Sequence, residues 1–233
     1  MRKGDEKKQE MLAVAERLFC LKGYEATSVQ DILDVLHISK GGFYHHFASK
    51  EVVLECLFTR RAENALRETE ELLEAMVNPL QRLNTALKMF LPLRREDKAF
   101  MAMLLPLIER QEGRSMRLCF QESLEEAFLP LMEREIDLAM QAEVIMPPVH
   151  DCAHLLLHLL SKCWQDAAMH LLDSARKNQE HSPAALLGIL EQYRRTVEVL
   201  LDAPYGSVNF ADLKEWDALS EVLMRRMMLP MQG

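Results

Sequence analysis

No stretch of the chain approaches the ~20 consecutive apolar residues that a membrane-spanning helix needs. The early apolar run at residues 11–21 is interrupted by Glu16 and Arg17, so it lacks the form of a secretory signal. The five cysteines are scattered without a CxxC pair, and their odd number argues against a disulfide framework. These absences predict a soluble, cytoplasmic chain with reduced thiols and no membrane partner.

The motifs of common enzyme classes are also missing: GxSxG, the P-loop, the dinucleotide fingerprint and HExxH. We therefore expect neither an enzyme nor a cofactor. His150, His154 and His158 share one helical face and, with Cys152 nearby, have a spacing at which a transition metal could bind. Polar residues continue that face as far as Gln165, which favours a solvated surface and predicts no metal site.

The charge distribution is uneven along the chain. A net charge of −8 is the wrong sign for a protein that neutralises phosphates. Residues 1–60, however, hold equal numbers of basic and acidic residues, so the whole negative charge belongs to the remainder. Basic residues gather at the N-terminus, where a solvated tail, taken alone, explains them better than a DNA-binding arm does: Arg2, Lys3, Lys7 and Lys8.

Local signals predict three short helices in the first 48 residues. The first ends near Lys22, because Gly23 is typical of the position after a helix. Ser28 and Asp31 form a capping box that starts a second helix, which runs to about residue 36. After a tight turn at residues 37–38, Ser39 caps the third. This pattern indicates a helix-turn-helix, which places its second helix in a DNA groove.

The third helix begins with residues that are unfavourable in an isolated helix. Gly41 and Gly42 each cost up to ~1 kcal/mol relative to alanine. Lys40 and Lys50 lie at the first positions of their helices, where the helix dipole disfavours a cation. A phosphate near both ends would remove that mismatch, and glycine would let the backbone approach a groove closely. Possible donors to DNA follow directly: Tyr44, His45 and His46.

The segment at residues 23–51, GYEATSVQDILDVLHISKGGFYHHFASKE, resembles the signature of the tetracycline-repressor (TetR) family in nearly every position. The resemblance is close over residues 8–55, with bulkier residues than usual at 33–36. It implies an all-α protein with a helix-turn-helix DNA-binding domain at residues 1–48 and a ligand-binding and dimerisation domain at 49–233. It also implies a homodimeric repressor that binds a palindromic DNA operator and is released by a small, mostly apolar effector.

The resemblance also implies roles for single residues. The third helix would enter the major groove, held to the core by Phe43 and Phe47. Phosphate contacts would come from Thr27, Ser28, Tyr44 and Lys50, and base-edge contacts from Lys40, Gly42 and His45. Ser39 and Gly41 complete the predicted DNA-binding set.

The rest of the chain predicts a larger helical body. A long helix runs from about residue 49 to 78, followed by helices near 80–90, 100–111, 114–142, 149–174, 182–201 and 210–229. Pro106 and Pro130 fall inside two of them and should kink them, which leaves room between neighbours. Soft and aromatic side chains nearby could line an apolar pocket, although each taken singly fits plain core better: Met89, Phe90, Met101, Leu104, Phe120 and Phe128.

The helices near 149–174 and 182–201 are apolar over a wide arc, so each needs partners on two sides. The resemblance implies that they pair with their copies in a four-helix bundle, with these predicted interface residues: Leu156, Leu160, Trp164, Gly188 and Tyr193. Alternatively, the last helix covers the second face within a monomer. A metal-sensing repressor and a DNA-binding module regulated by a protein partner remain alternative functions.

Overall fold

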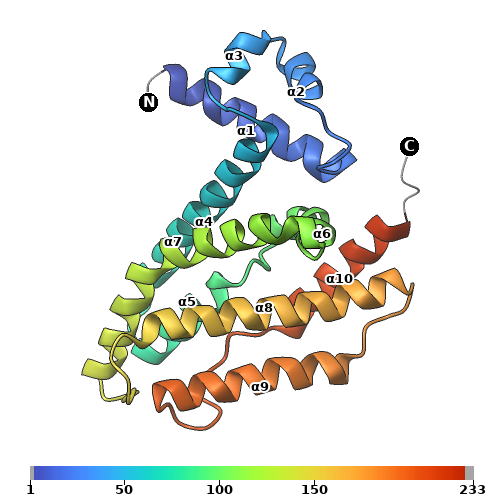
Figure 1. Cartoon of the computed structure of the whole chain (residues 1–233). Coiled ribbons are helices and arrows are strands. Elements are labelled where there is room, and N and C mark those ends of the chain that lie inside the picture. Colours follow the sequence, from blue (N-terminus) through green and yellow to red (C-terminus); the bar gives the residue numbers. More distant parts are fainter. Residues whose placement is uncertain (1–2, 229–233) are drawn as a thin grey trace.

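The computed structural model describes residues 3–228, and every regular element in that range is a helix (Figure 1). Leu229, the predicted end of the last helix, lies outside the described residues. The all-α prediction is confirmed. The elements are α1 (Lys3–Lys22), α2 (Val29–Leu36), α3 (Lys40–Tyr44), α4 (Lys50–Glu74), α5 (Pro79–Phe90), α6 (Asp97–Ile108), a short 3-10 helix (Gln111–Gly113), α7 (Arg114–Gln141), α8 (Cys152–Arg176), α9 (Pro183–Leu201) and α10 (Leu213–Met228).

Helices α1 to α3 form a small unit, here called the head, and the later helices form the body (Figure 1). The predicted helix ends are present in the head. Gly23 has a positive φ of 100° and its N–H donates to the Phe19 carbonyl at 2.9 Å. Ser28 and Asp31 make the complete capping box of α2, and Ser39 caps α3. These local contacts fix the turns that orient α3.

Helix α4 runs from the head into the body, as its unbroken sequence predicts (Figure 1). Ser49 caps its first turn by accepting from the Val52 N–H at 3.3 Å. The helix ends at Glu74, four residues before the predicted end. The early end is stabilised by Arg82 of α5. Its guanidinium donates to the carbonyl of Leu73, in the last turn of α4, at 2.6 Å, and to that of Met76, just after the helix, at 3.1 Å.

The body packs α4 and α5 against α7, while α8 packs against α7, α9 and α10, and α10 also packs against α6 (Figure 1). Pro106 and Pro130 lie inside α6 and α7, as predicted. Helix α6 begins and ends three residues earlier than the pattern indicates. Its start is set by Asp97, which lies in the first turn and is buried against Arg61 and Arg94. Among the helices of residues 3–228, none is long and apolar enough to cross a membrane.

Aromatic side chains tie the layers of the body together. Phe58 of α4 meets the rings of Phe100 and Phe120 edge to face, with centroids 6.2 and 5.3 Å apart. Trp164 of α8 stacks on Trp216 of α10 at 5.4 Å. Because such ring pairs add to the free energy of burial, α4 and α10 are both fixed to the centre of the body.

Besides α4, the head touches the body where α1 packs against α6, and through two arginines of the body. At the end of α10, Arg226 donates from Nη1 to the Cys20 carbonyl, near the end of α1, at 2.8 Å. Arg110, after α6, pairs with Glu25 of the loop that follows α1 at 2.7 Å. The ion pair of Arg110 is largely exposed and contributes little to stability. Arg226, in contrast, is partly buried and satisfies a carbonyl at the end of a helix.

Candidate functional site

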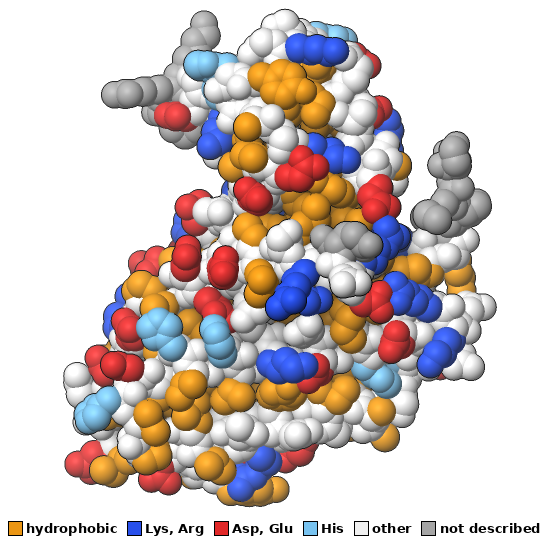
Figure 2. Space-filling view, in the orientation of Figure 1, with side chains coloured by type: hydrophobic (Ala, Val, Ile, Leu, Met, Phe, Trp, Pro, Cys, Tyr) orange, Lys and Arg blue, Asp and Glu red, His pale blue; other side chains and the backbone are white. Residues whose placement is uncertain are grey.

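Helix α3 lies at the end of the head that is farthest from the body, with Lys, Arg and His side chains around it (Figures 1 and 2). Lys40, Tyr44 and His45 are exposed, Tyr44 to 54%. Phe43 and Phe47 are buried beneath them with their rings 5.7 Å apart. The helix is therefore held from the inside by two aromatic anchors and presents its polar side chains outward.

Packing inside the protein does not require glycine at either of the two glycine positions of α3. A Cβ at Gly41 or Gly42 would meet only the Ser39 hydroxyl, at 3.9 and 3.6 Å, which is ordinary contact. Both positions have negative φ, since neither is among the residues with left-handed backbone. Glycine costs up to ~1 kcal/mol in a helix, so its presence here is consistent with close approach by something outside the chain.

Two of the residues expected to contact phosphate use their side chains internally. The Thr27 side chain is fully buried and its hydroxyl donates to the Gly23 carbonyl at 2.7 Å. That hydroxyl is therefore unavailable to a phosphate, because it is needed to close the end of α1. The Ser28 hydroxyl is exposed, but it donates to Asp31 at 2.6 Å and accepts from the Asp31 N–H as the helix cap.

Lys50 is also engaged within the head. Its ammonium donates to the carbonyls of Tyr24 and Thr27 at 2.9 and 3.0 Å and lies 4.2 Å from the centre of the Tyr24 ring. Burial lowers the pKa of Lys50 below its usual value. Two backbone carbonyls thus explain a cation at the start of α4, and a phosphate contact would have to compete with them. In contrast, Tyr44 and Lys40 make no hydrogen bond or ion pair with the described residues.

The basic residues at the N-terminus are part of α1 from Lys3 onward, so this part of the predicted arm is helical. Lys7 pairs with Glu10 at 2.7 Å, and the Lys8 ammonium lies 5.7 Å from the Phe47 ring centre. Arg2 lies outside the described residues. Lys8 therefore adds a cation beside the base of α3.

A cavity of about 190 Å³ lies between α5, α6, α7 and α8; it is called the main cavity below. Its base is made of buried side chains: Phe90, Pro92, Leu105, Ile108, Phe120, Leu124 and Trp164. Its rim carries partly exposed side chains: Glu109, Arg117, Gln121, Ser161, Gln165 and Met169. The division into apolar base and polar rim fits a ligand that buries its apolar part.

The residues predicted to line a pocket separate into three groups. Phe90 and Phe120 line the main cavity. Met89 and Met101 line a second space of about 10 Å³, called the inner cavity below. Leu104 and Phe128 are fully buried core residues that line neither, and Phe128 packs edge to face on Phe90.

The predicted interface residues on α8 point into the body instead of outward. Leu156, Leu160 and Trp164 are buried, because one face of α8 packs against α7 and α10. The outward face holds their neighbours: a groove of about 420 Å³ is lined by Leu155, His158, Leu159, Thr196, Val199 and Leu200, and is called the α8/α9 groove below. Figure 2 shows a row of hydrophobic side chains along this face.

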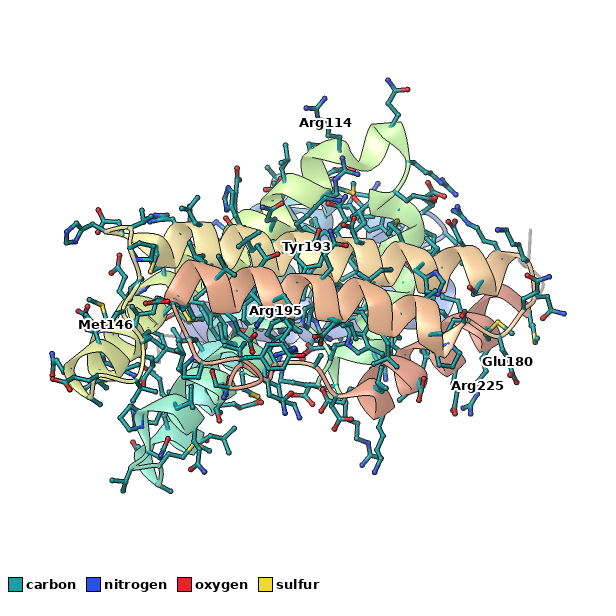
Figure 3. All side chains as sticks on the ribbon, turned by 90° about the horizontal axis from the view of Figure 1, so that it is seen from below. Arg114, Met146, Glu180, Tyr193, Arg195 and Arg225 are labelled. Atoms are coloured by element: carbon teal, nitrogen blue, oxygen red, sulfur yellow. The ribbon has the colours of Figure 1, made fainter. Side chains whose placement is uncertain are left out.

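The α9 residues fit this face in part. Gly188 is exposed and a Cβ there would meet no atom within 4 Å. Tyr193 lies between α8 and α9, where its hydroxyl donates to Asp166 at 2.6 Å (Figure 3). Tyr193 therefore joins the two helices of one chain.

The three histidines of α8 and the preceding loop do not gather with one another around a common point. No group of His, Cys, Asp and Glu side chains within the described residues could hold a metal ion. His158 pairs instead with Glu125 of α7 at 2.8 Å. His154 and His150 are exposed, in agreement with the solvated face that the sequence favours.

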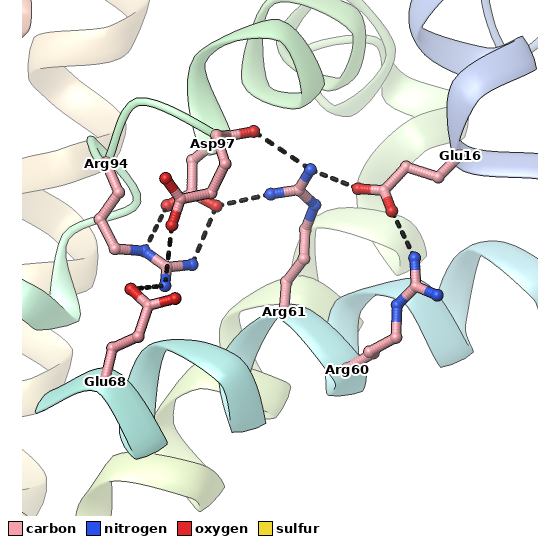
Figure 4. A network of polar contacts seen from close by, with 7 residues as sticks. Glu16, Arg60, Arg61, Glu68, Arg94 and Asp97 are labelled. Carbon is pink, nitrogen blue, oxygen red and sulfur yellow. Dashed lines mark hydrogen bonds and ion pairs between the residues drawn. The ribbon is translucent and has the colours of Figure 1, made fainter. Parts of the chain in front are cut away.

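Three contacts between distant parts of the chain have no local signal in the sequence. Arg61 of α4 pairs with Glu16 of α1 and with Asp97 of α6, so it joins head and body (Figure 4). Arg226 closes α1 from α10. Their partners are distant in the chain, so helical periodicity alone cannot find them.

Comparison with known proteins agrees with the geometry of the head. The sequence model described as "Bacterial regulatory proteins, tetR family" matches residues 11–57. The HTH-type transcriptional repressor KstR2 of Mycobacterium tuberculosis is 36% identical over 74 residues, which are 32% of this chain and 37% of that repressor. The match thus spans about a third of the curated relative.

Solved structures resemble nearly the whole chain in fold. A TetR-family transcriptional regulator from Pectobacterium atrosepticum has 19% sequence identity and a TM-score of 0.61, covering 88% of this chain and 99% of its own. The regulator FadR from Bacillus subtilis, in complex with stearoyl-CoA, has 17% identity and a TM-score of 0.55, covering 79% and 96%. At these identities the likeness extends to the arrangement of helices in head and body.

Proposed function

Because the chain belongs, through its amino-terminal domain, to the tetR family of bacterial regulatory proteins, we propose that it represses transcription as a homodimer bound to a palindromic operator. The carrying observation is the tip of α3, where Lys40, Tyr44 and His45 are exposed, Lys40 and Tyr44 make no hydrogen bond or ion pair with the described residues, and the buried Phe43 holds the helix from below. This is the geometry of a recognition helix in a major groove. Gly41 and Gly42 allow its backbone to approach the DNA.

The second part of the proposal concerns the subunit arrangement. The α8/α9 groove is apolar, and its Leu155 and Val199 are 51% and 68% exposed. The two helices lie side by side along one face of the body (Figure 3). A second copy packed on this face through a twofold axis would cover both helices and place two α3 helices on the same side of the dimer. One such dimer matches a palindromic site.

The third part is release by a small molecule in the main cavity. Its volume of about 190 Å³ is close to the ~150 Å³ of a protein cavity that binds benzene, so the effector is the size of a small ring compound. A coupling of ~1–3 kcal/mol would weaken operator binding roughly 5–150-fold.

Selection of bound duplexes from a random pool tests the DNA-binding function directly. We expect an inverted repeat whose half-sites lie about 34–36 Å apart, or a small multiple of that, because twofold symmetry fixes the separation of the two α3 helices. Recovery of a direct repeat would contradict the twofold arrangement. Absence of any enriched sequence would contradict the proposed function as a sequence-specific regulator.

Lys40 and Lys50 provide a matched pair for the contacts with DNA. Lys40→Ala is expected to weaken binding and to reduce the slope of log affinity against log salt by about 1, because its ammonium has no internal partner. Lys50→Met should leave the slope unchanged and lower the melting temperature, since it removes two hydrogen bonds to carbonyls. DNA titrations at several salt concentrations measure the slope for both variants, and thermal unfolding measures the melting temperature. If the salt slope changes equally in the two variants, Lys50 contacts a DNA phosphate as Lys40 does.

A further inference from the structure

Arg61 occupies a position between the head and the ligand-binding part of the body (Figure 4). One of its terminal nitrogens binds Glu16 of α1, and the other donates to Asp97 of α6 at 2.6 Å. The guanidinium also lies 4.3 Å from the centre of the Phe100 ring. A displacement of this one side chain would therefore change contacts in both parts of the molecule.

Arg61 is also part of the wall of the inner cavity. That space of about 10 Å³ has room for about one water-sized group. It shares four lining residues with the main cavity, so the two spaces lie against each other: Phe90, Pro92, Phe120 and Leu124. A molecule in the main cavity can thus reach the inner cavity with a single protruding atom when these side chains separate.

An acceptor for the Nε–H of Arg61, a residue of this wall, is what such an atom would supply. This Nε–H is buried, and no acceptor within the described residues takes a hydrogen bond from it. Both terminal nitrogens of the same guanidinium are occupied. A buried donor without a partner costs free energy, so a ligand acceptor at this point would gain more affinity than one facing water.

The charges around Arg61 decide which kind of acceptor fits. Three arginines, Arg60, Arg61 and Arg94, meet four carboxylates: Glu16, Glu68, Glu96 and Asp97. The cluster is therefore already negative by one charge. An additional buried anion would be repelled and would lose its hydration, whereas a carbonyl, ether or hydroxyl oxygen brings an acceptor without charge.

We propose that the effector is a small, neutral, mostly apolar molecule whose single acceptor oxygen binds the Arg61 Nε–H, and that Arg61 transmits its presence to Glu16 of the head. This inference rests on the proposed ligand-responsive function. Arg61 is a positioning residue for the head, because accepting a ligand hydrogen bond shifts the same planar group that binds Glu16. Arg60 also binds Glu16, but it lines neither cavity, which makes it the matched control.

Three ring compounds of similar size test the ligand class: acetophenone, ethylbenzene and benzoate. Calorimetric titration of the full chain should give the tightest binding for acetophenone. The ratio of ethylbenzene to acetophenone dissociation constants should fall roughly tenfold or more in Arg61→Met, as a hydrogen bond to a charged donor predicts, and remain unchanged in Arg60→Met. Arg61→Lys keeps the charge but has no Nε–H, so it should also lose the preference while remaining folded.

Operator binding separates this inference from the proposed function. Saturating acetophenone should weaken binding of the wild type and of Arg60→Met to the selected inverted repeat, and leave Arg61→Lys unaffected. An unchanged preference in Arg61→Lys, or failure of all three probes to bind, would overturn the ligand assignment while DNA binding without ligand still supports the regulator. If acetophenone binding depends on Arg61 but does not change operator affinity, the proposed transmission from Arg61 to the head is wrong.

Discussion

Replacing Arg82 by methionine is expected to lower the free energy of unfolding by about 3–5 kcal/mol. The guanidinium binds both oxygens of Glu135 at 2.7 and 2.8 Å, and the Glu135 side chain is fully buried on α7. Without Arg82 that carboxylate would be left in the interior with a single, partly exposed partner. The substitution also frees the last carbonyls of α4, so the helix that joins head and body would lose its closing contacts. Urea unfolding followed by circular dichroism measures the change.

Two variants separate the ion pair from other effects of the substitution. Arg134 contacts the same carboxylate at 3.2 Å, but its side chain is 49% exposed, so Arg134→Met should cost less than about 1 kcal/mol. Combining Arg82→Met with Glu135→Leu should recover part of the loss, because no unpaired charge remains. If Arg82→Met proves as mild as Arg134→Met, the Glu135 carboxylate is not effectively buried.

Val199→Glu is expected to convert the proposed dimer to monomers and to reduce operator affinity by about 10²–10⁴-fold, the gain that two linked half-sites provide. Val199 lies on the outward face of α9 and lines the α8/α9 groove. A charge there would be buried on association and would face its own copy near a twofold axis. Gly188→Glu tests the same face, since residues eleven apart on a helix point in nearly the same direction. Analytical ultracentrifugation and operator titration measure the two effects.

A matched control is available at Val77, which follows α4 and is 92% exposed. Val77→Glu adds the same charge away from the α8/α9 groove and should leave both mass and affinity unchanged. The monomers should retain the melting behaviour of a folded chain, because a side chain at Gly188 meets no atom of its own subunit. An intact dimer for both Val199→Glu and Gly188→Glu would move the interface to another face.

The head could be predicted closely because its determinants are local. The capping box at Ser28, the cap at Ser39 and the stop at Gly23 each depend on residues a few positions apart, and all three are present. Lys50 shows where local reasoning ends. Its place at the start of a helix suggested an external anion, but its partners are carbonyls 23 and 26 residues earlier in the chain.

The body could be predicted in helix order but less well in helix orientation. Helix α8 carries leucines on nearly every side, and adjacent residues such as Leu155 and Leu156 differ by ~100° around the axis. Their sequence therefore could not decide which leucine faces the core and which faces a second copy. The same ambiguity separates Leu104 from Leu105, of which only Leu105 lines the main cavity.

The contact between Arg226 and Cys20 also has a consequence for how the protein is made. The two residues are 206 positions apart, so α1 is synthesised long before the side chain that closes its end. At ~5–20 residues per second, that interval is about 10–40 s. During this time a nascent chain has a head without its contact to α10. A newly made subunit thus gains this closing contact of α1 only after α10 has been synthesised.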